Sequence, residues 1–234
     1  NDFVMNPTIR RVIGPEQSGV NFRDVVDDSK ILLVDIQKGE VGETVSQLVG
    51  SIVTTKIWAA AQSRVTQPVE ERTPFFLYVD ELQNFGGEGS NFTKILSEAR
   101  EYRLGCWLAT QYLHQLATDM RRAVVNNCRT KICFNPDGSE NETQIAGMFQ
   151  GLSKNQLKAL GKFRAAVQKP SKKSHNNAIL FDTYPPWEPE DVDVDQLKKQ
   201  GTAATSHTAT ELKASQSLGQ GNNAGGDKHR ELLA

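Results

Sequence analysis

The 234-residue sequence lacks several features that mark particular classes of protein. No apolar run approaches the ~20 residues that a membrane-spanning helix needs. Three cysteines, with no Cys-x-x-Cys spacing and no leading signal peptide, argue against a disulfide framework and favour reduced thiols. His114, Cys128 and Cys133 also lack the spacing of a zinc site. We therefore expect a cytoplasmic protein, with membrane association through regions upstream of this chain as an alternative.

An excess of charge of one sign is also missing. Lys and Arg together number 27 and Asp and Glu 28, which gives a formal net charge of -1. This balance excludes a uniformly basic nucleic-acid binder, but it leaves room for local basic patches. Because 38% of the residues are hydrophobic and 24% are charged, the chain has the composition of a globular protein.

Aromatic residues make up only 7% of the chain, and none follows Trp187. Beyond that position Gly, Ser, Thr, Ala, Gln and Lys dominate, a composition that cannot bury a core. We therefore predict one domain over residues 1–187 and a linker and tail over residues 188–234, disordered from about Gly201 onward.

Short apolar runs alternate with segments of helical periodicity upstream of the tail. This pattern predicts an α/β fold with a mostly parallel sheet flanked by helices, whose strands are buried on both faces. The expected strands are Ile31–Asp35, Phe75–Asp80, Cys106–Thr110, Lys131–Phe134, Arg164–Gln168 and Ala178–Asp182.

Apolar residues at three- and four-residue spacing predict a long amphipathic helix over Thr44–Ser63. A second helix is expected after Ser90, a candidate N-cap. Two capping-box spacings, Ser139 with Glu142 and Ser153 with Gln156, predict helix starts near Glu140 and Lys154.

Two adjacent carboxylates, Asp80 and Glu81, close the apolar run that begins at Phe75. A buried strand that delivers acids at its carboxyl end is how a Walker B element is built, and ligands bind at this end of open α/β sheets. Asp80 is then a candidate metal-shell ligand and Glu81 a candidate general base. The alternative is an acidic pair that ends a strand in solvent. Asp35 ends an earlier run but is followed by Ile36, so we interpret it as structural.

Two further residues are candidates for the same chemistry. Gln111 follows the strand Cys106–Thr110 and can donate to phosphate while accepting from water, although it can equally be a polar loop residue. Arg100 lies near a helix end, where an arginine usually favours the helix dipole or forms a surface ion pair. In an oligomeric ATPase such an arginine can reach the neighbouring subunit's nucleotide as an arginine finger.

Several stretches resemble the TraG/TraD-like coupling ATPases of type IV secretion and conjugation, in the FtsK/HerA branch of RecA-like motors. The resemblance spans about Phe3 to Pro186. Its central stretches are FFLYVDELQNF and NFTKILSEAREYRLGCWLATQYLHQL, with NPTIRRVIG, VNFRDVVDDSKILLVDIQKGEVGE and AAAQSR upstream and RRAVVNNCRTKICF downstream. Leu82 stands where the family usually has Phe, which changes packing alone.

The resemblance implies a RecA-like P-loop NTPase core that binds ATP and Mg²⁺. It implies that Asp80 orders Mg²⁺ through water, that Glu81 is the catalytic carboxylate, that Gln111 senses the γ-phosphate and that Arg100 is a finger acting in trans. It also implies a homo-hexameric ring that moves DNA without reading its sequence, with secretion-channel and relaxosome proteins as partners.

A phosphate-binding loop, Gly-x-x-x-x-Gly-Lys-Ser/Thr, is absent from the sequence. The segment Gly14–Asn21 has the glycines, but Val20 and Asn21 stand where Lys and Ser/Thr are required, and Gly219–Ala224 lies in the tail. We expect the Walker A element to precede Asn1 in the intact protein and this chain alone to be inactive. The alternatives are a non-hydrolytic ring or docking module, and an ATPase that moves protein or viral DNA.

Basic residues gather in two later segments. Arg121 and Arg122, and Lys158 and Lys162, are candidate contacts to a nucleic-acid backbone. Given the balanced total charge, we favour the simpler interpretation that they form solvated helical faces.

Overall fold

The computed structural model describes residues 19–85, 91–136, 142–171, 177–186 and 193–205. The chain divides into two compact units, Phe22–Pro189 and a unit formed by residues 1–21 with 190–234. The helix described in the latter is α10, Val194–Thr205. The expectation of a disordered chain from about Gly201 is therefore wrong as far as Thr205, and residues 206–234 lie outside the described part.

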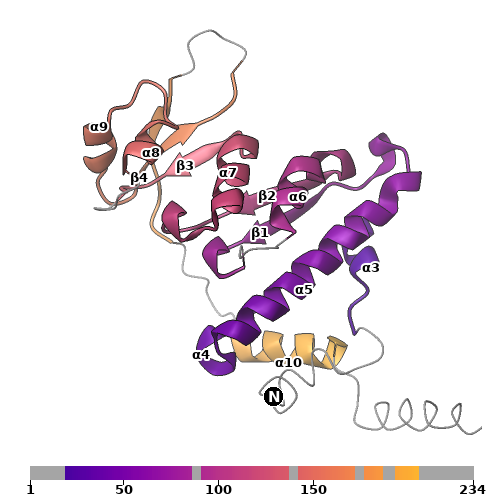
Figure 1. Ribbon diagram of the computed structural model, residues 1–234. Helices are drawn as coiled ribbons and strands as arrows, with labels where there is room; N and C mark the ends of the chain where they lie inside the picture. Colours follow the sequence, from indigo (N-terminus) through magenta and orange to yellow (C-terminus); the bar gives the residue numbers. More distant parts are fainter. Residues whose placement is uncertain (1–18, 86–90, 137–141, 172–176, 187–192, 206–234) are drawn as a thin grey trace, which may run out of the picture. The chain divides into compact units, whose positions relative to one another are not determined.

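The larger unit alternates helices and strands (Figure 1). Its described α-helices are α3 Phe22–Asp27, α4 Lys38–Val41, α5 Glu43–Gln62, α6 Phe92–Glu98, α7 Thr118–Asn127, α8 Glu142–Ala146 and α9 Lys154–Lys158. Short 3₁₀ turns are η1 Ser63–Thr66, η2 Val69–Glu71, η3 Leu82–Asn84, η4 Ala99–Tyr102 and η5 Leu113–Gln115. The strands are β1 Phe75–Val79, β2 Leu104–Leu108, β3 Lys131–Cys133, β4 Arg164–Gln168 and β5 Ile179–Asp182.

The strands β1 and β2 pair in parallel, with Phe75 opposite Leu104 and Val79 opposite Leu108. The connection between them runs through α6, as a parallel pair requires a crossover. The expected α/β class with a parallel sheet flanked by helices is confirmed. Both strands therefore end at the same edge, which places the residues after Val79 and after Leu108 side by side.

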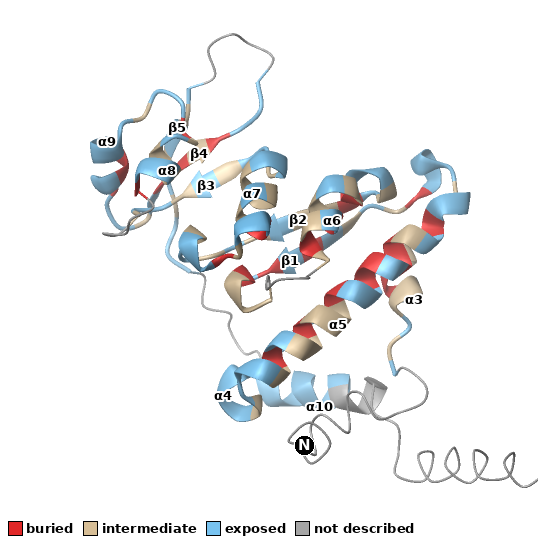
Figure 2. Cartoon of the chain, viewed as in Figure 1, coloured by how far each residue is buried: buried red, intermediate tan, exposed pale blue. Residues whose placement is uncertain are grey.

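One face of the β1–β2 pair is buried by α5, α6 and α7. Period-2 alternation sends every second side chain of each strand toward these helices. Buried residues also recur along α5 (Figure 2). The core formed there includes Ile57, Trp58, Leu77, Val79, Leu82, Phe92, Ile95, Leu104 and Met120.

The opposite face of the same pair is apolar and open. The exposed fractions of Phe76, Tyr78 and Trp107 are 53%, 69% and 55%. The rings of Tyr78 and Trp107, which are opposite each other in the register, stack with centroids 5.8 Å apart. The expectation that the strands are buried on both faces is wrong for β1 and β2, because no described element covers these side chains.

The segment Ile31–Asp35 forms no strand, which contradicts the sequence-based expectation. Ile31 and Leu33 are 87% and 83% exposed. A strand needs a neighbouring ladder to satisfy its backbone, and this segment has none among the described residues. Its apolar composition predicts burial but cannot supply a partner.

The three later strands form a separate antiparallel sheet in the order β3-β4-β5. The expectation of a mostly parallel sheet is wrong for them. For β4 and β5 the reason is the short connection, because a parallel pair needs about a dozen linking residues or more, and the chain between Gln168 and Ile179 is shorter than that. The core beneath this sheet is small and includes Phe149, Leu157, Leu160 and Ala166.

Two of the predicted helix starts are confirmed, and two N-cap candidates lie outside the described residues. α5 begins and ends within one residue of the expected Thr44–Ser63. Ser153 and Gln156 form the expected capping box of α9. α6 begins at Phe92 with Asn91 as its N-cap, and the candidates Ser90 and Ser139 lie outside the described residues. In the part of the chain that the structure describes, no helix combines the length and apolarity needed to cross a membrane.

Candidate functional site

The chain turns sharply after β1, at the two predicted carboxylates. Asp80 is exposed, and its Oδ1 accepts a hydrogen bond from the Glu81 N–H at 2.9 Å. Glu81 is half-buried and has left-handed backbone angles, φ 51° and ψ 51°. Such a conformation in a residue other than glycine costs on the order of 1–3 kcal/mol and must be held by its surroundings.

The backbone around Glu81 is held by β2. The N–H of Leu82 donates to the Ala109 carbonyl at 2.9 Å, and the N–H of Ala109 donates to the Val79 carbonyl at 2.9 Å. Leu82 is fully buried, so its side chain packs in the core and fixes the turn that follows β1. The parallel register therefore fixes where the Glu81 side chain starts.

Gln111 lies beside Glu81, as the sequence predicts. Its Nε2 donates to Glu81 Oε1 at 2.7 Å. This contact joins the carboxyl ends of β1 and β2 through side chains thirty positions apart in the sequence. The structure thus brings two of the predicted site residues together, and their roles in a reaction stay predictions.

Sequence reasoning missed two members of this cluster. Gln83, in η3, donates from Nε2 to Glu81 Oε2. The hydroxyl of Thr110 donates to Gln83 Oε1 at 2.8 Å. Gln83 is one polar residue in a polar loop, and the signal that it matters is the hydrogen-bond pattern rather than its type or spacing.

The cluster suits Mg²⁺ held chiefly by a nucleotide. Mg²⁺ commonly takes one or two carboxylates and fills its other positions with waters and substrate phosphates. Asp80 offers one exposed carboxylate, which meets that need through water. Among the described residues there is no group of three His, Cys, Asp or Glu side chains that could hold a metal ion by itself.

Arg100 lies at the other end of the strand pair. It is exposed in η4, just before β2 begins opposite the start of β1. Because five strand residues span about 15 Å, Arg100 and Glu81 of one chain do not meet. The predicted arginine finger is therefore far from its own subunit's carboxylate.

Two buried arginines anchor the turn that carries Arg100. Arg64 is fully buried and donates to the carbonyls of Thr73, at 2.6 Å, and Tyr102. Arg72 donates to the Glu101 carbonyl at 2.6 Å and lies over the Tyr102 ring, 5.7 Å from its centroid. The backbone of η4 is thus tied to the segment that follows α5.

Among the described residues, the carboxylate paired with Arg64 is a distant one. Asp27 Oδ1 lies 4.0 Å from its Nη1. Burial lowers the pKa of the Arg64 guanidinium below its usual value, and the Asp27 charge opposes that shift. Its Nε has no hydrogen-bond partner in the described part of the chain. The hydrogen bonds to the carbonyl oxygens of Thr73 and Tyr102 therefore supply most of the compensation for burying the Arg64 charge.

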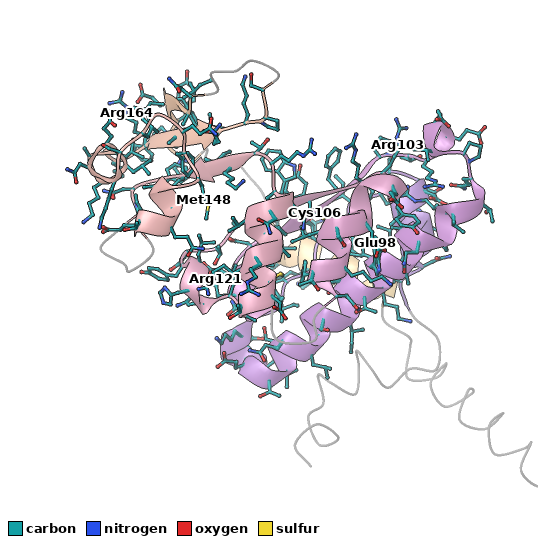
Figure 3. All side chains as sticks on the ribbon, turned by 45° about the horizontal axis from the view of Figure 1, so that its top comes forward. Glu98, Arg103, Cys106, Arg121, Met148 and Arg164 are labelled. Atoms are coloured by element: carbon teal, nitrogen blue, oxygen red, sulfur yellow. The ribbon has the colours of Figure 1, made fainter. Side chains whose placement is uncertain are left out.

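The four predicted nucleic-acid contacts fall into two kinds of environment. Arg121 and Arg122 line an open pocket of about 220 Å³, together with Thr118, Val125, Asn126 and Gln144. In Figure 3 Arg121 lies on α7, well apart from Arg103, which directly precedes β2. None of the described residues that line this pocket carries a carboxylate.

Lys158 and Lys162 are engaged within the chain. Lys158 forms an ion pair with Glu142 at 2.8 Å, beside Lys154 at 2.7 Å. Hydrogen bonds from Lys154 and Lys158 lower the pKa of Glu142. The Lys162 ammonium lies 4.9 Å from the centroid of the Phe163 ring. Within the described residues, their side chains thus have an ion pair or a ring contact, whereas Arg121 and Arg122 line an open pocket.

The three cysteines are free thiols. Burial raises the pKa of Cys106 and of Cys133 to about 11, and it also raises that of Cys128. The nucleophile and metal ligand is the thiolate, so these residues are poor candidates for either role.

Part of the chain matches a known protein family. Residues 74–178 match the family described as the TraM recognition site of TraD and TraG. The chain therefore contains a TraG/TraD-like C-terminal portion, which confirms the resemblance drawn from the sequence. No curated protein matches the chain.

Two solved structures share the fold. The genome packaging NTPase B204 from Sulfolobus turreted icosahedral virus 2, in complex with AMPPCP, is 15% identical with a TM-score of 0.51, over 71% of this chain and 73% of that chain. The bacterial conjugative coupling protein TrwBdeltaN70, in complex with sulphate, is 13% identical with a TM-score of 0.52, over 70% of this chain. The match spans 43% of that coupling protein's length. At these identities the likeness establishes a P-loop NTPase fold.

Proposed function

We propose that the intact protein containing this chain is an ATP-driven, DNA-translocating coupling ATPase of a type IV secretion or conjugation system. Its subunits form a homo-hexameric ring and hydrolyse ATP at their boundaries. The observation that carries the proposal is the hydrogen bond between Glu81 and Gln111 at the carboxyl end of β1 and β2. Ligands of α/β sheets bind at that end.

The side chains divide the work of hydrolysis. Glu81 accepts a proton from the water that attacks the γ-phosphorus, while the bond to the β–γ bridging oxygen breaks to leave ADP and phosphate. Gln111 contacts the γ-phosphate. Asp80 holds Mg²⁺ through water, and the ion supplies neutralisation of phosphate charge when bound.

Arg100 completes the site of the neighbouring subunit. Its exposure and its distance from its own Glu81 suit a side chain that acts across a boundary. An arginine finger stabilises charge on the transferring phosphoryl group. This assignment also gives a reason for the ring, since one chain alone cannot bring both groups to one nucleotide.

The proposed partners follow from the proposed function as a coupling ATPase. DNA passes through the ring and is held by its backbone, with Arg121 and Arg122 as the candidate contacts because the described lining of their pocket contains no carboxylate. Secretion-channel and relaxosome proteins are further partners, in keeping with the name of the matching family. A cytoplasmic location stays a prediction.

A second candidate function is the movement of viral DNA. It is favoured by the fold shared with the genome packaging NTPase B204. The two candidates use the same hydrolytic residues and differ in cargo. Translocation assays with plasmid and with phage-length duplexes in the intact protein would separate them.

The proposal is tested by Glu81→Gln in the intact protein. We expect DNA-stimulated ATPase turnover to fall by about 10²- to 10⁴-fold, the usual contribution of a general base. The matched control is Glu71→Gln, which changes an exposed glutamate in η2 and should leave turnover unchanged. Wild-type turnover in Glu81→Gln would overturn the assignment of the base.

A further inference from the structure

Gln83 is the side chain that links Glu81 to the end of β2. Its amide nitrogen donates to Glu81 Oε2, and its amide oxygen accepts from the Thr110 hydroxyl at 2.8 Å. The orientation of this amide is set by chemistry, because an ionised carboxylate can only accept. Both ends of the Gln83 side chain are therefore bound within the protein.

The two oxygens of Glu81 are held in different ways. Oε1 accepts from Gln111, which is exposed and is also proposed to contact the γ-phosphate. Oε2 accepts from Gln83, which is half-buried and rests on Thr110. Gln83 thus holds the carboxylate through contacts within the protein, whereas Gln111 is also proposed to contact the γ-phosphate.

The side chain of Glu81 needs such a support. Its left-handed angles and the hydrogen bond from Leu82 to Ala109 fix the Cα position, but they leave the side-chain torsions free. A general base must lie within hydrogen-bond reach of the proton that it takes. A second hydrogen bond to the carboxylate restricts the torsions that would carry it away.

We propose that Gln83, braced by Thr110, is a positioning residue for the catalytic carboxylate Glu81. This inference rests on the proposed function, since it assumes that Glu81 activates water. It goes beyond the predicted site residues, because the sequence predicts no role for Gln83 or Thr110, although both lie in the stretches that carry the family resemblance. It also couples the base to β2 through side chains, independently of Gln111.

The test is Gln83→Ala in the intact protein. We expect kcat for ATP hydrolysis to fall about 10- to 100-fold, because a misplaced group loses much of its catalytic effect, while the Kd for AMPPCP with Mg²⁺ stays unchanged. Thr110→Val, which removes the hydroxyl at nearly constant volume, should lower kcat by a few-fold in the same direction. The control is Gln115→Ala, an exposed glutamine in η5.

A second measurement separates positioning from a general structural role. In the Glu81→Gln background, Gln83→Ala should cause no further loss of residual turnover, because residues that act as a unit are non-additive. An equal loss in both backgrounds would overturn the inference, as would an unchanged kcat in both Gln83→Ala and Thr110→Val. If Glu81→Gln itself retains wild-type turnover, the proposed function fails, and that result is independent of Gln83.

Discussion

The two ends of the β1–β2 pair carry side chains of opposite character. At the carboxyl end lie Asp80 and Glu81 with neutral amides, and at the amino end lie Arg100 and the arginines that hold its turn. The ends are about 15 Å apart along the strands. The two ends therefore carry opposite charge, and under the proposed function they would serve one nucleotide from two neighbouring subunits.

The two ends are also built differently. The carboxyl end is joined by hydrogen bonds between half-buried and exposed side chains. The amino end is joined by buried guanidinium groups that donate to backbone carbonyls. Substitutions at the carboxyl end should therefore change the reaction more than stability, and substitutions beneath the amino end should do the reverse.

The largest expected effect is that of Arg100→Ala. We expect ATPase turnover in the intact protein to fall by about 10³-fold or more, as for other arginine fingers, with unchanged thermal unfolding because Arg100 is exposed. Steady-state kinetics and a thermal scan check both parts. Arg129→Ala, at another exposed arginine, is the control. Full turnover in Arg100→Ala would contradict a role for Arg100 in ATP hydrolysis.

Arg64→Met tests the supports of the amino end. It leaves the carbonyls of Thr73 and Tyr102 without their donors. We expect a loss of about 2–4 kcal/mol in the free energy of unfolding, since each stranded buried acceptor costs on the order of 1–3 kcal/mol. Urea unfolding followed by tryptophan fluorescence measures it.

The matched change for Arg64→Met is Arg122→Met on the surface of α7. It should alter stability by less than about 0.5 kcal/mol. If the two variants are equally stable, the buried guanidinium is not what holds η4.

Gly50→Ala should have a smaller effect, at the carboxyl end. A Cβ at Gly50 of α5 would lie 2.2 Å from Cδ1 of Phe85, the residue that follows η3. Overpacking of this kind costs about 1–3 kcal/mol, which outweighs the helix-propensity gain of about 1 kcal/mol. Thermal unfolding should show a net loss, and Phe85→Leu should restore part of it.

Gly39→Ala provides the comparison, because a Cβ at Gly39 meets nothing within 4 Å. It should be neutral or slightly stabilising. A Gly50→Ala protein that is as stable as Gly39→Ala would contradict the close packing of Phe85 on α5.

The sequence was informative where a local pattern and the local structure obey the same constraint. The apolar run of β1 followed by Asp80 and Glu81 predicted a strand that ends in acids, and the parallel register places Gln111 beside Glu81. The capping box at Ser153 and the periodicity of α5 were confirmed for the same reason. Each signal is complete within a few residues.

The predictions that were wrong, and the residues that the sequence did not reveal, share a different cause. Ile31–Asp35 has the composition of a strand, but pairing depends on a neighbour that composition does not specify. Whether β3, β4 and β5 pair in parallel or antiparallel likewise depends on the length of the connections and on which strands become neighbours. Gln83, Arg64 and Arg72 are ordinary polar residues until the fold brings distant carbonyls or carboxylates to them.

The most direct test of the shared site mixes two inactive variants of the intact protein. Arg100→Ala subunits keep Glu81, and Glu81→Gln subunits keep Arg100, so a boundary between them can contain both groups. With subunit exchange verified by energy transfer between labelled subunits, we predict that the mixture hydrolyses ATP faster than the sum of the two variants, with a maximum at intermediate ratios. Turnover equal to that sum at every ratio would contradict a site built from the two ends of neighbouring chains.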